Sequence, residues 1–308
     1  MTTETIEQTF AVHAPARLSL ANIRGSVKIT AGEADRIEIR AQKQLDSGDT
    51  DNTQVILRQA EDGSVSAETR FDGRSWFSLP VVKPCKVDYL VRVPQACHLQ
   101  INGVSNSASL QWVTGEISLS TVSGSLELVN LTGSLRVRSV SGDISGQNIS
   151  GQLGLETVSG DLLLADSSLV ELNASTVSGD LVIHSPLSGE PVHLNSVSGD
   201  VILFVPRTSS FAINSQSISG EVVTRLPVAQ RQKNFGQTRV QIGQGGTSIL
   251  HRSVSGDLIL KESEQADAPQ VETEQAAADH MELLERIERG EMSVAEALQS
   301  LQPEAPPA

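Results

Sequence analysis

Aromatic residues and long apolar runs are scarce in this chain of 308 residues. Only 3% of the residues are aromatic, so a hydrophobic core has to be built from Val, Leu, Ile and Ala. No stretch approaches the ~20 consecutive apolar residues of a membrane-spanning helix. The N-terminus, MTTETIEQTF, has no basic segment followed by an apolar run, so no signal peptide is visible. We therefore expect a cytoplasmic protein with no membrane span.

Cysteine is also rare. Cys85 and Cys97 are too few for a disulfide framework or a cysteine-based metal site. They flank the strand-like run 86–94, which leaves two alternatives: a bridge across a hairpin, or two buried thiols. We favour buried thiols, because free cysteine is among the most buried residue types.

Positive charge is in short supply, with a net charge of −14 and a pI near 4.8. Nucleic acid and anionic membrane surfaces need a basic footprint, so both are disfavoured as partners. From Lys261 to the end there are twelve acidic and three basic residues, a net −9. The first 260 residues therefore carry only −5, and most of the acidity belongs to the C-terminal segment.

Catalytic signatures are missing. The sequence has no H-E-x-x-H, G-x-S-x-G, P-loop or Rossmann fingerprint. The histidines show no metal-ligand spacing and are predicted to be surface or strand residues: His13, His98, His184, His193, His251 and His280. We expect no enzyme, no cofactor and no metal site.

What the chain does have is a repeat. A unit of the form V-S-G-D-L recurs every nine residues between 113 and 158, and alternate copies continue beyond that block. The stronger copies are separated by 18, 18, 19, 20 and 21 residues and begin at Val122, Val140, Val158, Val177, Val197 and Ile218. A last copy follows at Val254, after an interval of 36 residues.

Each unit has the chemistry of a strand, a turn and a second strand. In one copy, Val158, Leu162 and Leu164 are spaced to point inward. Gly160 marks the turn, where a positive φ is needed, and Asp161 can accept backbone N–H groups there. Such a short pair of strands cannot bury its own apolar face, whereas stacked coils cover one another. The sequence predicts an all-β fold, a parallel β-solenoid with coils of 18–21 residues, rather than a propeller or a sandwich.

Four aspartates fall at one phase of the coil: Asp143, Asp161, Asp180 and Asp200. Stacked at ~4.8 Å, their charges repel one another unless water or a cation intervenes. Calcium binding and a solvated row of turn residues both stay open. We favour the solvated row, because each unit has one glycine where calcium-binding nonapeptides have several.

Five segments follow from the pattern. Residues 1–102 are predicted as an N-terminal β cap continuous with the solenoid, and 103–261 as the β-solenoid repeats. Within the latter, 222–252 is an inserted loop or hairpin of undetermined role. Residues 262–278 form an acidic linker, 279–302 a helical hairpin and 303–308 a disordered tail.

The helical hairpin is the predicted partner-binding element. Asp279 with Glu282, and Ser293 with Glu296, fit two capping boxes, and Gly290 separates the helices. Helices of about ten residues are marginal alone, so we expect them to dock onto a second copy or a protein partner. The docking face comprises Met281, Leu284, Ile287, Val294, Leu298 and Leu301.

The T-V-S-G-D-L units, led in by V-R-V-P at 91–94, resemble the bacterial putative-adhesin family, domain of unknown function 4097. The segment LLERIERGEMSVAEA resembles the SHOCT-like helical domain. The first resemblance implies a non-enzymatic role in surface interaction, with some relatives tied to cell-envelope stress. The second implies oligomerisation or protein binding. Neither brings shared catalytic residues.

We therefore expect an adhesin-like interaction protein whose solenoid ligand is unidentified. A self-assembling, bactofilin-like scaffold is the alternative, and a polysaccharide-active β-helix enzyme is a weaker one. Trp76, Phe77 and Trp112 could line a sugar platform, but packing in the core or the cap is the favoured interpretation.

Overall fold

The computed structural model describes residues 2–72, 83–187 and 192–263. The chain divides into two units, Met1–Ser263 and Glu264–Ala308. The predicted helical hairpin, most of the acidic linker and the C-terminal tail lie outside the described residues. Trp76 and Phe77 lie outside them as well.

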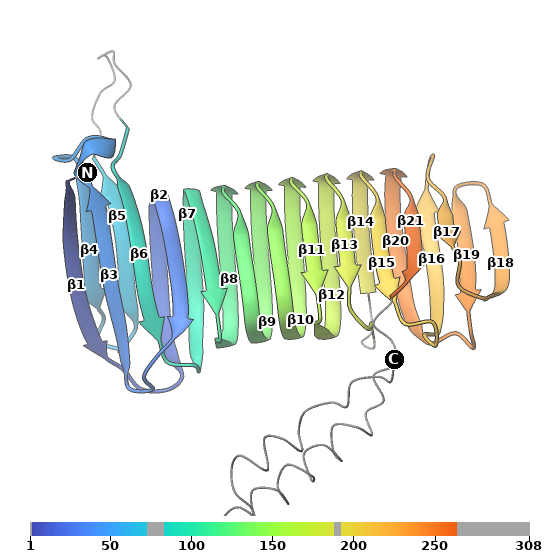
Figure 1. Cartoon of the computed structure of the whole chain (residues 1–308), viewed down its shortest axis with the longest axis horizontal. Coiled ribbons are helices and arrows are strands. Elements are labelled where there is room, and N and C mark those ends of the chain that lie inside the picture. Colours follow the sequence, from blue (N-terminus) through green and yellow to red (C-terminus); the bar gives the residue numbers. More distant parts are fainter. Residues whose placement is uncertain (1, 73–82, 188–191, 264–308) are drawn as a thin grey trace, which may run out of the picture. The chain divides into compact units, whose positions relative to one another are not determined.

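The first unit is all-β, as predicted, and its strands join in one continuous sheet (Figure 1). The only other element is a short 3-10 helix, η1 (Leu45–Ser47), among the residues that the structure describes. The N-terminal strands are β1 (Thr3–Ala11), β2 (Ala16–Ala31), β3 (Arg36–Gln44), β4 (Thr53–Gln59), β5 (Val65–Phe71) and β6 (Lys86–Val93).

The repeat region forms coils that stack in parallel. Leu126 pairs with Ile144 and Leu135 with Leu153, so each coil lies one 18-residue repeat beyond the last. The strands of this region are β7 (Cys97–Gln111), β8 (Thr114–Ser123), β9 (Leu126–Ser141), β10 (Ile144–Ser159), β11 (Leu162–Ala165), β12 (Ser168–Ser178), β13 (Leu181–His184), β14 (Val192–Ser198) and β15 (Val201–Val205).

The C-terminal strands depart from sequence order. They are β16 (Phe211–Ser217), β17 (Val222–Thr224), β18 (Val228–Asn234), β19 (Gln237–Ile242), β20 (Thr247–Ser255) and β21 (Leu258–Glu262). Strand β20 pairs with both β14 and β16, and β21 pairs with both β15 and β17. The last coil of the chain is therefore inserted between two coils that precede it in sequence.

The order of the coils departs from the sequence order at the N-terminal end as well. Strand β2 pairs in parallel with β7 on one side, and with β5 and β6 on the other. Antiparallel pairs then cover this end, β3 on β6, β1 on β3 and β4 on β5. Residues 16–31 thus form a coil of the stack although they lie within the predicted cap.

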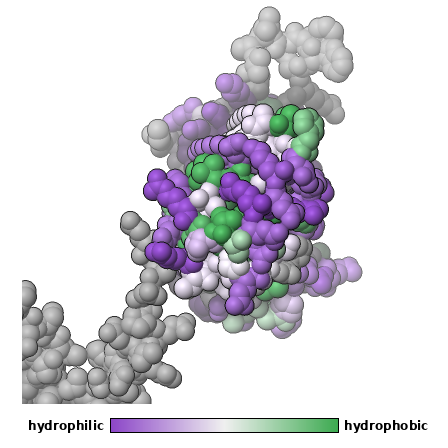
Figure 2. Space-filling view, turned by 90° about the vertical axis from the view of Figure 1, so that its right-hand side faces the viewer, coloured by the Kyte–Doolittle hydropathy of each residue, from purple (hydrophilic) through white to green (hydrophobic). Residues whose placement is uncertain are grey.

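The predicted insertion at 222–252 contains a hairpin that covers the other end of the stack. Strand β19 pairs antiparallel with β16, and β18 pairs with β19. Arg231 on β18 donates to the carbonyl of Val222 at 2.9 Å, and Lys233 forms an ion pair with Glu221 at 2.8 Å. Figure 2 looks onto this end and shows mostly hydrophilic side chains with smaller hydrophobic areas between them.

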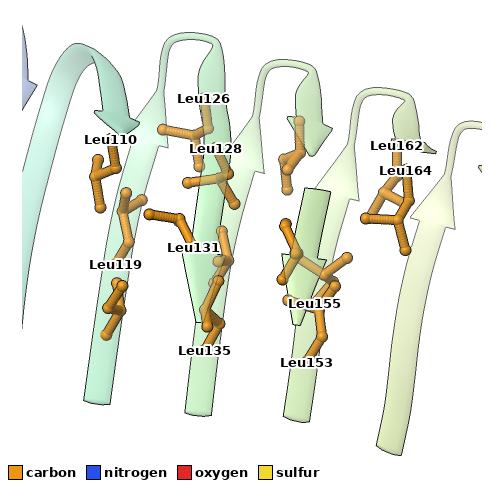
Figure 3. Close-up of a cluster of buried hydrophobic side chains, with 14 of the residues drawn as sticks. Leu110, Leu119, Leu126, Leu128, Leu131, Leu135, Leu153, Leu155, Leu162 and Leu164 are labelled. Atoms are coloured by element: carbon orange, nitrogen blue, oxygen red, sulfur yellow. The ribbon is translucent and has the colours of Figure 1, made fainter. Parts of the chain in front are cut away.

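The core runs along the inside of the coils as ladders of leucine and isoleucine. Leu126, Leu128, Leu131 and Leu135 come from one coil, and each is at most 2% exposed (Figure 3). Equivalent side chains of neighbouring coils stack on them in register, which removes their apolar surface from water. This burial stabilises the folded state by about 25 cal/mol per Å². The prediction that Leu162 and Leu164 point inward is confirmed, since both are buried.

The prediction for Val158 was wrong. Its side chain is 47% exposed, whereas the preceding Thr157 is 6% exposed. Alternation along the strand places these two neighbours on opposite faces, so the threonine takes the inward position at the corner of the coil. The same inversion recurs in other copies, where Val122, Val140, Val177, Val197 and Val254 are exposed.

The repeat glycines have the predicted positive φ, with the exception of Gly220. Gly160 has a φ of 129°. A β-carbon built on it would lie 2.7 Å from the carbonyl carbon of Gly142 in the neighbouring coil. Close approach of the coils at this corner therefore requires glycine on steric grounds as well as conformational ones.

Candidate binding surfaces

The row of aspartates has a structural role at the turns. Asp143 Oδ1 accepts the backbone N–H of Asp161 at 3.1 Å, and Asp161 Oδ1 accepts that of Asp180 at 2.9 Å. The series continues through Asp200 and Asp257 to the N–H of Glu221. Each carboxylate thus satisfies a donor of the next coil, and all of them reach solvent.

Within the described ranges, no group of three or more His, Cys, Asp or Glu side chains is placed to hold a metal ion. The bonds of the aspartate row run along the stack, from one carboxylate to the next N–H. Calcium sites instead gather six to eight oxygens around one point. The row therefore has the geometry of a turn cap.

A second corner of the coil carries residues that the sequence analysis missed. Trp112, Asn130, Asn148 and Asp166 each have a positive φ, between 49° and 63°. The amide of Asn148 donates to that of Asn130 in the adjacent coil. Asparagine and aspartate tolerate this conformation better than other side chains. The signal was the 18-residue spacing of Asn130, Asn148 and Asp166.

Trp112 is 56% exposed, so its predicted packing in the core or the cap was wrong. The conformation at the corner turns this side chain toward solvent. It stands among polar corner residues, with Asn130 in the equivalent position one coil along.

Both cysteines are free and buried, which confirms the prediction of two thiols. Burial raises the pKa of the Cys97 thiol to about 12. A thiol in this state is a poor nucleophile and a poor metal ligand, because both roles need the thiolate.

His251 lies in strand β20, which agrees with the prediction of a surface or strand residue, but only 1% of its surface is exposed. Its Nδ1 lies 2.9 Å from the hydroxyl of Ser215. Burial lowers the pKa of His251 to about 4, so the ring is neutral near pH 7. It fills an inward position between coils and is inaccessible to a ligand.

A broad open groove of about 840 Å³ lies over β2, β5, β7, β8 and β9. His98 Nδ1 accepts the backbone N–H of Glu116 at 3.1 Å in this groove. Serine hydroxyls and charges of both signs are among its lining groups. The outward-facing lining includes Arg17, Ser19, Asp62, Ser66, His98, Glu116, Ser118 and Arg136.

Such a surface offers hydrogen-bond donors and acceptors to an extended polar ligand. The sequence analysis proposed no residue of this groove, because its members come from five strands and share no motif. Their alignment depends on the registers Arg17 opposite His98 and Gln100 opposite Ser118.

No helix long and apolar enough to cross a membrane is present in the part of the chain that the structure describes. The predicted partner-binding residues all lie outside the described residues: Met281, Leu284, Ile287, Val294, Leu298 and Leu301.

Comparisons with known proteins give a family match and several remote structural likenesses. No curated protein matches the chain. A solved structure described as a putative adhesin from Parabacteroides distasonis is 8% identical, with a TM-score of 0.39, over 84% of this chain and 97% of that one. A putative lipid binding protein from the same organism is 12% identical, with a TM-score of 0.37 and the same coverage.

A putative cell adhesion protein from Clostridium sporogenes is 12% identical, with a TM-score of 0.25, over 84% of this chain and all of that one. The family model described as Toastrack DUF4097 matches residues 16–261, which include every coil of the stack. The chain therefore belongs to the Toastrack DUF4097 family.

Proposed function

We propose that this protein is a non-enzymatic, adhesin-like binding protein that presents the outer faces of a β-solenoid to its ligand. The observation that carries the proposal is the continuous stack of parallel coils, covered at each end by antiparallel strands. Such a stack provides wide, rigid outer surfaces.

The connections between successive strands are too short to form the walls of a catalytic cleft. Strand β9 ends at Ser141 and β10 begins at Ile144, and β8 and β9 are joined in the same way between Ser123 and Leu126. Polysaccharide-active β-helices have longer coils with protruding loops. This supports a binding role over the enzyme alternative.

The groove over β2, β5, β7, β8 and β9 is the ligand surface that we favour. It is open along its length, and it combines Arg17 and Arg136 with hydroxyl groups. Sugars and extended polar chains present hydroxyls and acidic groups that such side chains bind.

The covered ends also disfavour the scaffold alternative. Filaments of stacked solenoids need an open coil at each end. Here β18 and β19 lie over one end, and the exposed strand β18 carries Arg231 and Lys233. Charged side chains on an edge strand oppose pairing with another chain.

The C-terminal segment 279–302 is proposed to be a helical hairpin that oligomerises or binds a protein partner. Support comes from its capping boxes and apolar spacing. Surface association and a link to cell-envelope stress belong to this proposal too, on the strength of the family resemblance. Cytoplasmic residence is the competing proposal.

Binding can be tested with the full chain immobilised and challenged with a panel of glycans and extracellular matrix proteins. We expect saturable binding of one ligand class, weakened by Arg17→Ala and Arg136→Ala. Arg92→Ala, an exposed arginine outside the groove, is the matched control. If Arg17→Ala and Arg136→Ala bind the ligand as tightly as the unchanged chain does, the choice of groove is overturned.

Two further results bear on the alternatives. Filaments in electron micrographs of the purified protein would favour the scaffold, and hydrolysis of a panel glycan would favour the enzyme. For the C-terminal segment, Leu284→Asp combined with Leu298→Asp is expected to lower the oligomeric state or abolish partner binding. No change in either would contradict its proposed role.

A further inference from the structure

The outer face of strands β11, β13, β15, β21 and β17 carries a row of aliphatic side chains. They align in register across adjacent strands, Leu163 with Val182, Val182 with Ile202, Ile202 with Ile259, and Ile259 with Val223. Leu163 and Val223 are 47% and 45% exposed, and the three between them are half-buried. We call these five residues the aliphatic row.

The aliphatic row is specific to one part of the stack. The same row continues through earlier coils as Ser145, Glu127, Ser109 and Lys28, which are all polar. On the opposite side of the same C-terminal coils, the row formed by Ser175, Asn195 and Arg252 in register is polar. Strands with apolar residues on both faces are typical of strands that are covered on both faces.

The aliphatic row is flanked by two rows of different charge. On one side stand the turn carboxylates Asp161, Asp180, Asp200, Asp257 and Glu221. On the other side, Ala165, His184, Phe204 and Lys261 align in register. The rings of His184 and Phe204 stack at 3.7 Å, and Lys261 Nζ lies 5.4 Å from the Phe204 ring centre.

We propose that this face binds the same face of a second copy of the chain, forming a two-fold symmetric dimer. Two sheets can meet face to face about a two-fold axis that lies in the interface. If that axis runs along the aliphatic row, the rotation exchanges the two flanking rows. Lys261 of one copy then faces Asp257 of the other, and His184 faces Asp180.

An axis across the row gives the opposite result, with carboxylates facing carboxylates. Like charges at close range repel, so the arrangement of charges selects the axis along the row. Aliphatic side chains then meet their own counterparts, at the ~10 Å spacing of packed sheets. The strands of the two copies run antiparallel, which is the aligned class of sheet packing.

The size of the face predicts a weak dimer. Five strands and three rows cover roughly 20 by 13 Å per copy, well below the ~800 Å² per partner of a stable complex. We expect a dissociation constant of roughly 10–100 µM. This association is separate from the one proposed for residues 279–302.

Sedimentation of the full chain at rising concentration tests the proposal. We expect a monomer–dimer equilibrium whose dissociation constant rises at least about tenfold in Val182→Asp, since that variant buries a carboxylate without a partner. Ser134→Asp places the same group on the outer face of β9 and should leave the equilibrium unchanged. Circular dichroism melting checks that both variants fold. A monomer at ~200 µM, or equal behaviour of the two variants, overturns the proposal.

The pairing of Lys261 with Asp257 of the other copy gives a second test, which does not rely on the aliphatic row. Lys261→Glu should weaken the dimer, because its carboxylate faces Asp257 of the other copy. Adding Asp257→Asn should restore part of the affinity, because it removes the repulsion between the two carboxylates. The turn should be preserved, since the amide oxygen can still accept the N–H of Glu221. No recovery in the double variant contradicts the axis along the row.

Cross-linking reports the axis directly. Leu163→Cys alone should cross-link to itself with a short bismaleimide, and Val223→Cys should do the same. Cross-linking only in a mixture of the two variants would place the axis across the row and overturn the arrangement. Cys85 and Cys97 are buried and do not compete.

The C-terminal segment supplies the last control. The dimer should persist in Leu284→Asp combined with Leu298→Asp, and remain sensitive to Val182→Asp there. Self-association that disappears in this double variant but survives Val182→Asp would belong to the C-terminal segment and would overturn the aliphatic row as an interface.

Discussion

Asp180 Oδ1 accepts the backbone N–H of Asp200, one coil along the stack, at 2.8 Å. The N–H of Asp180 itself donates to Asp161 Oδ1 at 2.9 Å. A strand would otherwise begin with an unpaired donor at each turn. The carboxylate therefore links one turn to the next, and its recurrence in the repeat has a structural cause.

Asp180→Ala is expected to lower the free energy of unfolding by about 1 kcal/mol, because one N–H loses a charged acceptor. Asp180→Asn should cost less, since its amide oxygen can still accept that bond. Denaturant unfolding of both variants measures the difference. Equal losses in Ala and Asn would show that charge, and not hydrogen bonding, accounts for the aspartate.

Calcium should leave the melting temperature of the protein unchanged at millimolar concentration. The carboxylates are bonded in series along the stack and do not converge on one point. A ligand that binds the folded state alone would raise the melting temperature further as its concentration rises. A calcium-dependent rise that disappears in Asp180→Asn would establish a cation site in the row.

Two glycines in the same coil provide a matched pair. Gly160→Ala places a β-carbon 2.7 Å from the Gly142 carbonyl carbon, at a φ of 129°. Gly154→Ala meets nothing closer than 3.8 Å. We expect a loss of at least about 2 kcal/mol for the first, from strain and overlap, and a change within about 1 kcal/mol for the second. Chemical denaturation compares them, and similar losses would contradict the steric argument.

Both native thiols should resist an aromatic disulfide reagent at pH 8. Cys85 and Cys97 are fully buried, and burial raises the pKa of Cys97 to about 12. We expect less than ~0.1 thiol per chain to react promptly in the folded state, and two in denaturant. Rapid reaction of either thiol in the native protein would show that these strands open readily.

The repeat was enough to predict the stacked coils. Glycine and aspartate at fixed spacing marked the turns, and the buried leucines followed from strand alternation at Leu162 and Leu164. The orientation of Val158 could not be read in the same way. Hydrophobicity favoured an inward valine, whereas the corner of the coil accommodates Thr157 inside.

The order of the coils was beyond the sequence. Nothing in the copy at Val254 indicates that β20 and β21 lie before β16 and β17 in the stack. That exchange depends on long-range pairing, which local patterns do not encode. The groove residues were missed for the same reason, since strand register alone brings Arg17 beside His98.

His251 makes the stability of the protein depend on pH. Its pKa is about 4 in the folded state, compared with an ordinary value of 6.5. Between these values the unfolded chain binds more protons, so the free energy of unfolding falls as the pH falls from about 6.5 towards 4. The full loss amounts to roughly 3 kcal/mol, at about 1.4 kcal/mol per pKa unit.

Urea unfolding at pH 7.0, 6.0 and 5.0 measures this slope above the range in which most carboxylates titrate. His251→Gln retains a polar group beside Ser215 but cannot gain a charge. We therefore expect it to have a lower free energy of unfolding at pH 7, and that free energy should change little over the same pH range. His193→Gln, on the outward side of β14, is the matched control and should retain the wild-type slope. An unchanged slope in His251→Gln would mean that another group supplies the proton uptake.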